Sequence, residues 1–281
     1  MGINILCNMK VIVPMAGRGS RFAAAADSNP EYAKPKPFII VHGMPMVRWA
    51  TGSLPFVEHT GQTVEGEPRV TAKDLIFIIQ KEHDASHNIT VGLKEIYGND
   101  IHVIPLDGMT RGAAETAYKA KDLCDPEEDI IISDSDHYFD GTSLAELIVN
   151  KDADTDGIIP VFTPPDDGIA RWSYSLTKEG TNIIEQVGEK DLELMKAGAP
   201  ANIGAYYFSK AKVFFEEVED AIANNKLTGA KGKKEFYIAP MYQNLIEKGH
   251  KFQVAHTDIV WGLGTPADLE RFLAESGIEK P

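Results

Sequence analysis

Short, unbroken apolar runs recur through the first 150 residues, separated by stretches in which apolar residues follow a helical spacing. An unbroken run predicts a strand buried on both faces, as in a parallel sheet covered by helices. The predicted strands span residues 11–13, 38–41, 75–79, 101–104 and 130–132. The predicted helices span residues 45–54, with Pro45 as the first helical residue, 85–97 and 112–123. The polar residues 55–73 predict an inserted surface loop.

The second half of the chain has a different pattern, with several strands in succession before helices return. Strands are predicted over residues 157–163, 172–177, 182–187 and 201–208, and helices over 210–224, 236–248 and 266–275. Strands that alternate with helices in one half and follow one another in the other favour an α/β fold. We therefore predict a Rossmann-like, mixed, mostly parallel central sheet flanked by helices.

Composition sets limits on the kinds of partner. The chain has 281 residues, 43% of them hydrophobic, which suffices for one large α/β domain or two small ones. Its formal net charge of −14 argues against duplex nucleic acid or an anionic membrane as a partner. No apolar run approaches the ~20 residues that a membrane-spanning helix needs. A homo-oligomer is compatible with this composition.

The N-terminal residues and the cysteines favour a cytoplasmic protein. Residues 1–8 lack the long apolar segment and basic cluster of a signal peptide, and Met9 is a candidate start, with those residues as an extension. Cys7 and Cys124 do not make a disulfide framework. A reduced, cytoplasmic protein is therefore the expectation.

Residues 11–38 carry the strongest signal for a binding site. The first predicted strand runs into a loop with Gly17, Arg18 and Gly19, and a basic, proline-flanked segment ends at Phe38. Glycines let backbone N–H groups approach an anion, and arginine and lysine add positive charge. Because these charges are concentrated in one segment of an acidic chain, they predict an anion site, with a simple tight turn as the alternative.

An Asp-x-Asp sequence follows the predicted strand at residues 130–132. Asp134 and Asp136 are two residues apart, so both carboxylates can point the same way at the carboxyl end of a sheet strand. Such oxygen ligands suit Mg²⁺, which takes one or two carboxylates together with substrate phosphates. The alternative is a pair of turn-capping aspartates. His83 and His87 lack a third ligand at a suitable spacing and predict a solvated helix face.

The segments PMAGRGSRF and KPKPF resemble the N-terminal signature of the sugar nucleotidyltransferases, which have the nucleotide-diphospho-sugar transferase fold, related to the GT-A fold. The resemblance continues to the C-terminus. It implies one domain over residues 1–281, with a nucleotide-binding half at about 9–150 and an acceptor-binding half at about 151–281. It also implies Mg²⁺ as the cofactor and nucleotide-sugar synthesis, for example for capsule polysaccharide, as the role.

The resemblance assigns roles to the residues of the N-terminal segment. The loop that binds the triphosphate comprises Ala16, Gly17, Arg18, Gly19 and Ser20. Arg21 matches the arginine that stabilises the departing pyrophosphate, and Lys36 matches the lysine on the α-phosphate, with Lys34 as the alternative. Asp136 is the first expected metal ligand and Asp134 the second.

Further matches concern the nucleobase. Gln80, Thr110 and Gly112 occupy positions that surround the base in the family, where Gly112 would let the base lie against the main chain. An ordinary helix start is the alternative for Gly112. The segment TRGAAET is more similar to cytidylyltransferases than to the larger thymidylyltransferases, which favours a pyrimidine nucleotide and CTP in particular.

The C-terminal half matches the acceptor side of the family, with two departures. Glu189 and Lys190 resemble a Glu-Lys pair in which the lysine holds the acceptor phosphate, but Asp191 replaces the usual proline. Asn202 and Gly204 match a strand that lines the acceptor pocket. Gly262 stands where the family usually has a second metal-binding aspartate. Either the metal has fewer protein ligands, or Asp258 takes that place.

These observations predict an enzyme that joins an NTP to a phosphorylated small molecule, such as a sugar phosphate, and releases pyrophosphate. A glycosyltransferase that uses the Asp-x-Asp sequence to hold a nucleotide-sugar is one alternative, although that class lacks the GxGxR and KPKPF segments. A non-catalytic nucleotide sensor is the other, suggested by Gly262. The acceptor itself stays open.

Overall fold

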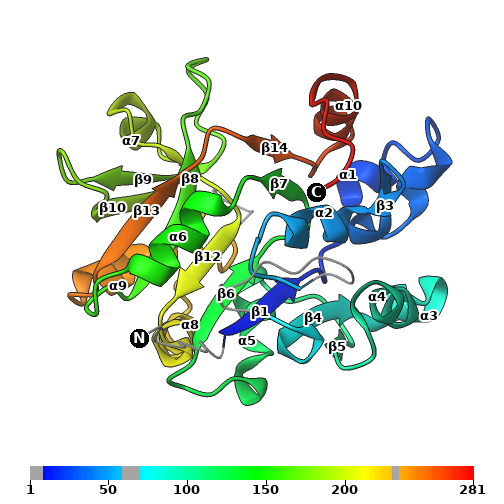
Figure 1. Ribbon diagram of the computed structural model, residues 1–281, viewed down its shortest axis with the longest axis horizontal. Coiled ribbons are helices and arrows are strands. Elements are labelled where there is room, and N and C mark those ends of the chain that lie inside the picture. Colours follow the sequence, from blue (N-terminus) through cyan, green and yellow to red (C-terminus); the bar gives the residue numbers. More distant parts are fainter. Residues whose placement is uncertain (1–8, 59–69, 230–233) are drawn as a thin grey trace, which may run out of the picture.

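The computed structural model describes residues 9–58, 70–229 and 234–281 (Figure 1). Ten strands of these residues form one central sheet, nine of them in a continuous order with β13 paired to β8. In spatial order the strands are β10 (Ile184–Glu189), β9 (Ser173–Thr177), β11 (Ala201–Asn202), β8 (Gly157–Phe162), β12 (Ala205–Phe208), β6 (Asp129–Ser133), β1 (Met9–Pro14), β4 (Leu75–Gln80) and β5 (His102–Leu106), and β13 is Phe252–His256.

The sheet is mixed, as predicted, and its two halves differ in strand direction. β6, β1, β4 and β5 are parallel, and so are β8 and β13. β12 runs antiparallel to both β6 and β8 and joins the halves. The first half therefore has the carboxyl ends of four parallel strands at one edge, which is where ligands bind in open α/β sheets.

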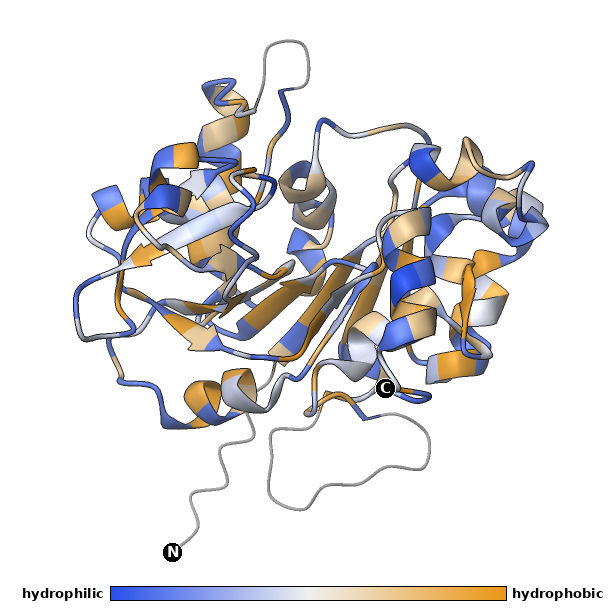
Figure 2. Ribbon diagram, turned by 90° about the horizontal axis from the view of Figure 1, so that it is seen from above, coloured by the Kyte–Doolittle hydropathy of each residue, from blue (hydrophilic) through white to orange (hydrophobic). Residues whose placement is uncertain are grey.

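Helices cover both faces of the sheet, and its central strands are mostly hydrophobic between them (Figure 2). On one face Ile12 of β1 belongs to the cluster formed with α5 (Ala113–Tyr118), α8 (Ala211–Ala223) and α9 (Ala239–Glu247). On the other face Val11 and Val13 pack with α2 (Met46–Gly52), α4 (Ile89–Tyr97) and α6 (Thr142–Asn150). Burial on both faces explains why these strands are unbroken apolar runs.

A third core cluster joins the two ends of the chain. β7 (His137–Phe139) pairs with β14 (Val260–Gly262), which leads into α10 (Pro266–Glu275). Leu269 and Phe272 of α10 pack with Trp49 of α2 and with Phe22 of α1 (Ser20–Ala23). Figure 1 shows α10 near α1 and α2. The turn between β14 and α10 is therefore held close to the glycine-bearing loop.

Several predicted elements need correction. The helix over 85–97 is two helices, α3 (Lys81–His87) and α4, because Asn88 between them has a left-handed φ of 52°. Pro45 ends the short hairpin of β2 (Ile40–Val41) and β3 (Met44–Pro45) and precedes α2 instead of starting it. The predicted strand over 201–208 is divided into β11 and β12.

Other elements were not predicted at all. They include α6, α7 (Leu192–Lys196), β7, β13 and β14. Most of the predicted loop over 55–73 lies outside the described residues. None of the helices in the described part of the chain is both long and apolar enough to cross a lipid bilayer.

Gly112 is required by the packing before α5. Its φ is 144°, and a Cβ there would lie 2.6 Å from the backbone N and O of Phe236. Gly112→Ala is therefore expected to lower the free energy of unfolding by about 2–4 kcal/mol, through overpacking and backbone strain. Gly108→Ala is the control, because a Cβ at Gly108 has no neighbour within 4 Å. Urea midpoints measure both, and equal midpoints would contradict this account.

Candidate functional site

The glycine-bearing loop connects β1 to the single helical turn α1. Gly19 has a left-handed φ of 61° and caps α1, while Phe22 is buried in the third core cluster. In the described part of the chain, the backbone N–H groups of residues 17–20 donate to no protein acceptor. The loop therefore presents several free donors at the carboxyl end of β1, the arrangement that suits an anion.

Lys36 lies beside this loop and is paired with Asp136. Its Nζ donates to Asp136 Oδ2 at 2.7 Å, and a Cβ on Gly19 would lie 3.5 Å from the Lys36 Cβ. Lys34 points elsewhere, because its Nζ pairs with Glu31 at 2.7 Å. The geometry therefore brings Lys36, not Lys34, to the loop and the aspartates.

The two aspartates differ in protonation. Burial, together with the charge of Asp136, raises the pKa of Asp134 to about 7. Burial also raises the pKa of Asp136, but the charge and hydrogen bond of Lys36 outweigh it and hold that pKa below the usual range. The charge of Arg21 on α1 acts in the same direction as Lys36. Charge interactions therefore connect Arg21 and Lys36 with the two aspartates.

Two glycines let backbone approach the carboxylates. A Cβ on Gly204 would lie 2.2 Å from Asp134 Oδ2, and one on Gly264 would lie 2.6 Å from Asp136 Oδ2. The Gly204 carbonyl accepts a hydrogen bond from the Asp134 N–H at 2.7 Å, and the Asp136 carbonyl accepts one from the Leu263 N–H at 2.8 Å. Backbone between β11 and β12, and backbone between β14 and α10, therefore lie close to Asp134 and Asp136.

The carboxylate oxygens of Asp134 and Asp136 suit Mg²⁺ better than a metal that takes all of its ligands from the protein. Within the described ranges, no group of three or more His, Cys, Asp or Glu side chains is arranged to hold a metal ion. Mg²⁺ commonly takes only one or two carboxylates and completes its shell with water and phosphate oxygens. Asp136, ionised and a quarter exposed, fits that role, and Asp134 fits it once deprotonated.

The register of β14 decides between the alternatives at Gly262. Gly262 pairs with His137, directly after Asp136, whereas Asp258 lies before β14 at the opposite end of the pairing. The three paired residues of β14 separate Asp258 from the end of the pairing that lies next to Asp136, which argues against Asp258 as a substitute for the missing aspartate. Of the two expectations, fewer protein ligands for the metal agrees with this geometry.

The raised pKa of Asp134 predicts a pH dependence of stability. Between about pH 4 and pH 7 the unfolded chain loses a proton that the folded protein keeps, so stability falls as the pH rises through this window. In metal-free buffer, the Tm of Asp134→Asn minus that of the wild type should grow from about pH 4 to about pH 7 and then level. A difference that stays constant with pH would contradict the assignment.

Glu189, one of the residues expected on the acceptor side, lies close enough to Asp134 to influence its charge. Glu189 accepts a hydrogen bond from Ser173 and lies 3.2 Å from Lys190 Nζ, and its charge helps to raise the pKa of Asp134. Lys190 has a φ of 53°, uncommon for lysine, and its Nζ lies 5.3 Å from the centre of the Tyr237 ring. The charge of Glu189 therefore links the end of β10 electrostatically to Asp134.

Among these residues, Asn202 has the hydrogen bonding that points most directly to a bound ligand. Its Oδ1 accepts a hydrogen bond from Ser175 at 2.7 Å, but its buried Nδ2 has no partner among the described residues. An unpaired buried donor is costly, so such a group suggests a ligand acceptor. His137 has a similar unpaired Nε2, and burial lowers the pKa of His137 to about 4, which keeps it neutral.

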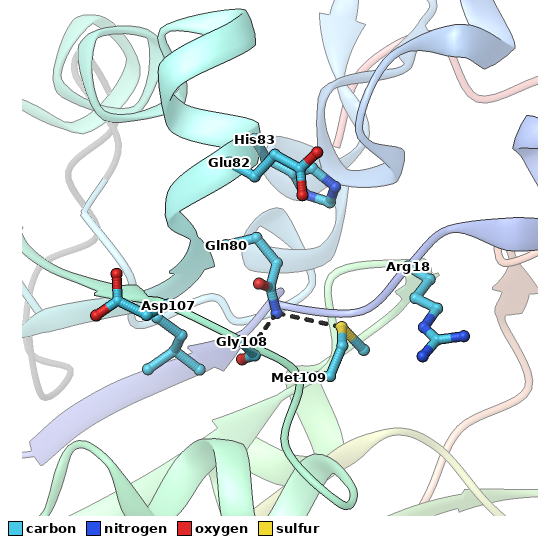
Figure 3. Close-up of a pocket in the computed structure, with 8 residues that line it drawn as sticks. Arg18, Gln80, Glu82, His83, Asp107, Gly108 and Met109 are labelled. Carbon is cyan, nitrogen blue, oxygen red and sulfur yellow. Dashed lines mark hydrogen bonds between the residues drawn. The ribbon is translucent and has the colours of Figure 1, made fainter.

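A pocket of about 280 Å³ opens at the ends of β4 and β5 (Figure 3). It is lined by Arg18, Gln80, Glu82, His83, Leu106, Asp107, Gly108 and Met109. Arg18 comes from the glycine-bearing loop, so the pocket adjoins the candidate phosphate site. Gln80 lies at its centre and donates through Nε2 to the Ala16 carbonyl at 2.8 Å.

Thr110 and Gly112 follow the pocket but do not line it. The Thr110 hydroxyl bonds to that of Thr116 at 2.5 Å, and Gly112 packs against the backbone of Phe236. Gly112 therefore has a packing role before α5. This agrees with the alternative that Gly112 belongs to an ordinary helix start.

Some residues of the site were not predicted. Glu82, His83, Asp107 and Met109 line the pocket. No residue of α3, which carries His83 and His87, is buried, in agreement with the predicted solvated helix face. Tyr237 and Gly264 were also missed as site residues. A signal exists only for Gly264, which directly precedes Thr265 and Pro266 at the start of α10. The other residues depend on contacts between distant segments.

Comparison with known proteins establishes the fold. No protein-family model matches the sequence, and no curated protein matches it either. Solved structures do match. The nucleoside-diphosphate-sugar pyrophosphorylase from Vibrio cholerae RC9 is 22% identical with a TM-score of 0.72, over 94% of this chain and 100% of that one.

Two further solved structures have a similar fold. The inositol-1-phosphate CTP transferase from T. maritima is 14% identical with a TM-score of 0.63, over 97% of this chain and 98% of that one. The UTP-bound UGPase from Acinetobacter baumannii is 15% identical with a TM-score of 0.68, over 97% of this chain and 94% of that one. The chain therefore has the sugar nucleotidyltransferase fold over nearly its whole length, as the sequence predicted.

Proposed function

We propose that this protein is a nucleotidyltransferase that joins an NTP to a phosphorylated small molecule and releases pyrophosphate. One observation carries the proposal: in a chain with the sugar nucleotidyltransferase fold, the Lys36–Asp136 pair lies beside a loop with free backbone donors. Positioning and charge neutralisation are what phosphoryl transfer mainly demands of a protein.

The reaction makes one bond and breaks one. An oxygen of the acceptor phosphate attacks the α-phosphorus, and the bond from that phosphorus to the β-phosphate oxygen breaks. The electron pair leaves with pyrophosphate. The acceptor phosphate is already an anionic nucleophile, so no side chain has to remove a proton.

Several residues share the neutralisation of phosphate charge in this reaction. The backbone of residues 16–20 holds the β- and γ-phosphates, and Arg21 stabilises the departing pyrophosphate. Lys36 contacts the α-phosphate, where negative charge accumulates in the transition state. Mg²⁺, held by Asp136 with Asp134, would neutralise phosphate charge when bound.

The acceptor half supplies the second substrate. Lys190 is half exposed beside Glu189, so its ammonium is accessible to an acceptor phosphate. The unpaired Asn202 Nδ2 supplies a donor for an acceptor hydroxyl or carbonyl. In this proposal residues 9–150 bind the nucleotide and residues 151–281 the acceptor.

Each alternative has one observation in its favour. The Asp-x-Asp sequence at the end of β6 also suits a glycosyltransferase, and Gly262 in place of an aspartate suits a nucleotide sensor. The loop donors with Arg21 and Lys36 favour the nucleotidyltransferase, because they serve a departing pyrophosphate better than simple binding.

Pyrophosphate release tests the proposal. The purified protein with Mg²⁺ is assayed with CTP, UTP, dTTP, GTP and ATP in turn, against a pool of sugar phosphates and phosphorylated amines. Release that requires both an NTP and the pool supports the nucleotidyltransferase. Consumption of a nucleotide-sugar without pyrophosphate release would support the glycosyltransferase, and nucleotide binding without turnover the sensor.

A further inference from the structure

Two serines of β9 lie on the same face of the central sheet. Ser173 and Ser175 are two residues apart on this strand, so their side chains share one face and Tyr174 between them lies on the other. Tyr174 packs there with Leu194 of α7. Both serines are buried, at 9% and 0% exposure. Because a buried hydroxyl needs a hydrogen-bond partner, the group that each serine contacts indicates its role.

The partners of the two hydroxyls lie on the two strands that flank β9. β9 lies between β10 and β11 in the sheet, and Ser173 is directly opposite Glu189 of β10. Ser173 Oγ donates a hydrogen bond to Glu189 Oε2. Ser175 Oγ donates one to Asn202 Oδ1 of β11 at 2.7 Å. The serines of one strand therefore hold a polar side chain of each neighbouring strand.

Each of these bonds fixes a side chain that has another group left for a ligand. Asn202 stands at the end of the two-residue strand β11, and its buried Nδ2 is unpaired among the described residues. The other carboxylate oxygen of Glu189 lies 3.2 Å from the Nζ of Lys190, whose side chain is half exposed. A side chain that is already held in place loses less conformational freedom when a ligand binds. The two serine bonds therefore preorganise the Asn202 amide and the Glu189–Lys190 pair.

We propose that Ser173 and Ser175 are positioning residues for the phosphorylated acceptor. Ser175 acts by holding the Asn202 amide, and Ser173 acts by holding the Glu189 carboxylate beside Lys190. This inference rests on the proposed function, because it takes Asn202 and Lys190 as acceptor-binding residues. The proposed nucleotide site lies in the other half of the chain, so the two serines should affect the binding of the acceptor and not that of the nucleotide.

The rate of pyrophosphate release tests the positioning role. The assay contains Mg²⁺, the nucleotide that the wild type prefers and serial dilutions of one fixed pool of sugar phosphates and phosphorylated amines. Ser175→Ala is expected to raise the pool concentration that gives half the maximal rate by about 5-fold. Ser173→Ala, which loses a bond to a charged group, should raise it by about 10-fold. The nucleotide concentration for half the maximal rate should stay within about twofold of the wild type in both variants.

Ser53→Ala is the matched control for losing a buried hydroxyl. Ser53 follows α2, is 2% exposed, and its Oγ accepts a hydrogen bond from the Phe139 N–H at 2.9 Å. Its loss should lower the Tm but leave the half-maximal concentrations of both substrates within about twofold. If the β9 variants behave like Ser53→Ala, or weaken the nucleotide as much as the pool, the two serines have a structural role only.

Double variants show whether each serine acts through its partner. Once Asn202 is replaced by alanine, Ser175→Ala should have no further effect, so the double variant should match Asn202→Ala within about twofold. The same comparison with Glu189→Ala tests Ser173. Effects that multiply in the double variants would overturn the positioning role, because each serine would then act independently of its partner.

The outcomes separate this inference from the proposed function. Pyrophosphate release by the wild type, with an unchanged pool requirement in both serine variants, would overturn the positioning role and leave the nucleotidyltransferase proposal intact. No release from the wild type with any of the nucleotides would contradict the proposed function itself, and the positioning role with it.

Discussion

Replacing Lys36 with alanine is expected to lower turnover by at least about 100-fold, the usual cost of removing one donor aimed at developing charge. Lys36 Nζ lies 2.7 Å from Asp136 and beside Gly19, and its side chain is about one quarter exposed. A triphosphate in the loop would therefore have its α-phosphate within reach of this ammonium. In the proposed mechanism the lysine acts mainly in the transition state, so nucleotide affinity should change less than turnover does.

Lys34→Ala is the matched control for this prediction. Lys34 is in the same proline-flanked segment, but it pairs with Glu31 and is more exposed. Its loss should change turnover by no more than about twofold, as is typical of exposed pairs. If Lys36→Ala keeps near-normal turnover, or if Lys34→Ala is the more damaged variant, Lys36 has no part in the mechanism.

Asp136→Asn is expected to lower turnover by about 100-fold or more, and to raise the Mg²⁺ concentration needed for half-maximal activity. The substitution keeps the size of the side chain, so the close approach of Gly264 is preserved. It removes the charge that pairs with Lys36 and that would hold Mg²⁺. It also removes the like charge that helps to raise the pKa of Asp134, so that pKa should fall.

Asp258→Asn is the comparison for the metal assignment. Asp258 lies beyond the far end of β14 from His137, so the variant should keep the Mg²⁺ dependence and stay within about twofold of wild-type turnover. Titrating Mg²⁺ against the rate of pyrophosphate release measures both variants. A normal Mg²⁺ requirement in Asp136→Asn, with a weakened one in Asp258→Asn, would reverse the assignment.

Local patterns predicted the half of the fold that contains the proposed nucleotide site. Residues 11–13, 75–79 and 130–132 are strands because both of their faces are buried, which is visible as unbroken apolar runs. The position of Asp134 and Asp136 follows from the end of β6.

Contacts between distant segments could not be predicted. The pairing of β7 with β14 joins residues more than 100 positions apart and brings Gly264 to Asp136. The orientation of the Gln80 side chain depends on its hydrogen bond to the Ala16 carbonyl, which lies just after β1. Gly112 is explained by Phe236, again a distant residue. None of these leaves a periodic pattern, because each depends on how the elements pack and not on either segment alone.

The most direct test of the proposed function is to follow the α-phosphate. The protein is incubated with Mg²⁺, NTPs labelled at the α-phosphorus and an extract of small metabolites, and the products are analysed by mass spectrometry. The account predicts a labelled product in which the nucleoside monophosphate is joined to a phosphorylated metabolite, in equal amount to the pyrophosphate released. Nucleotide that binds but passes no label to any metabolite would contradict it.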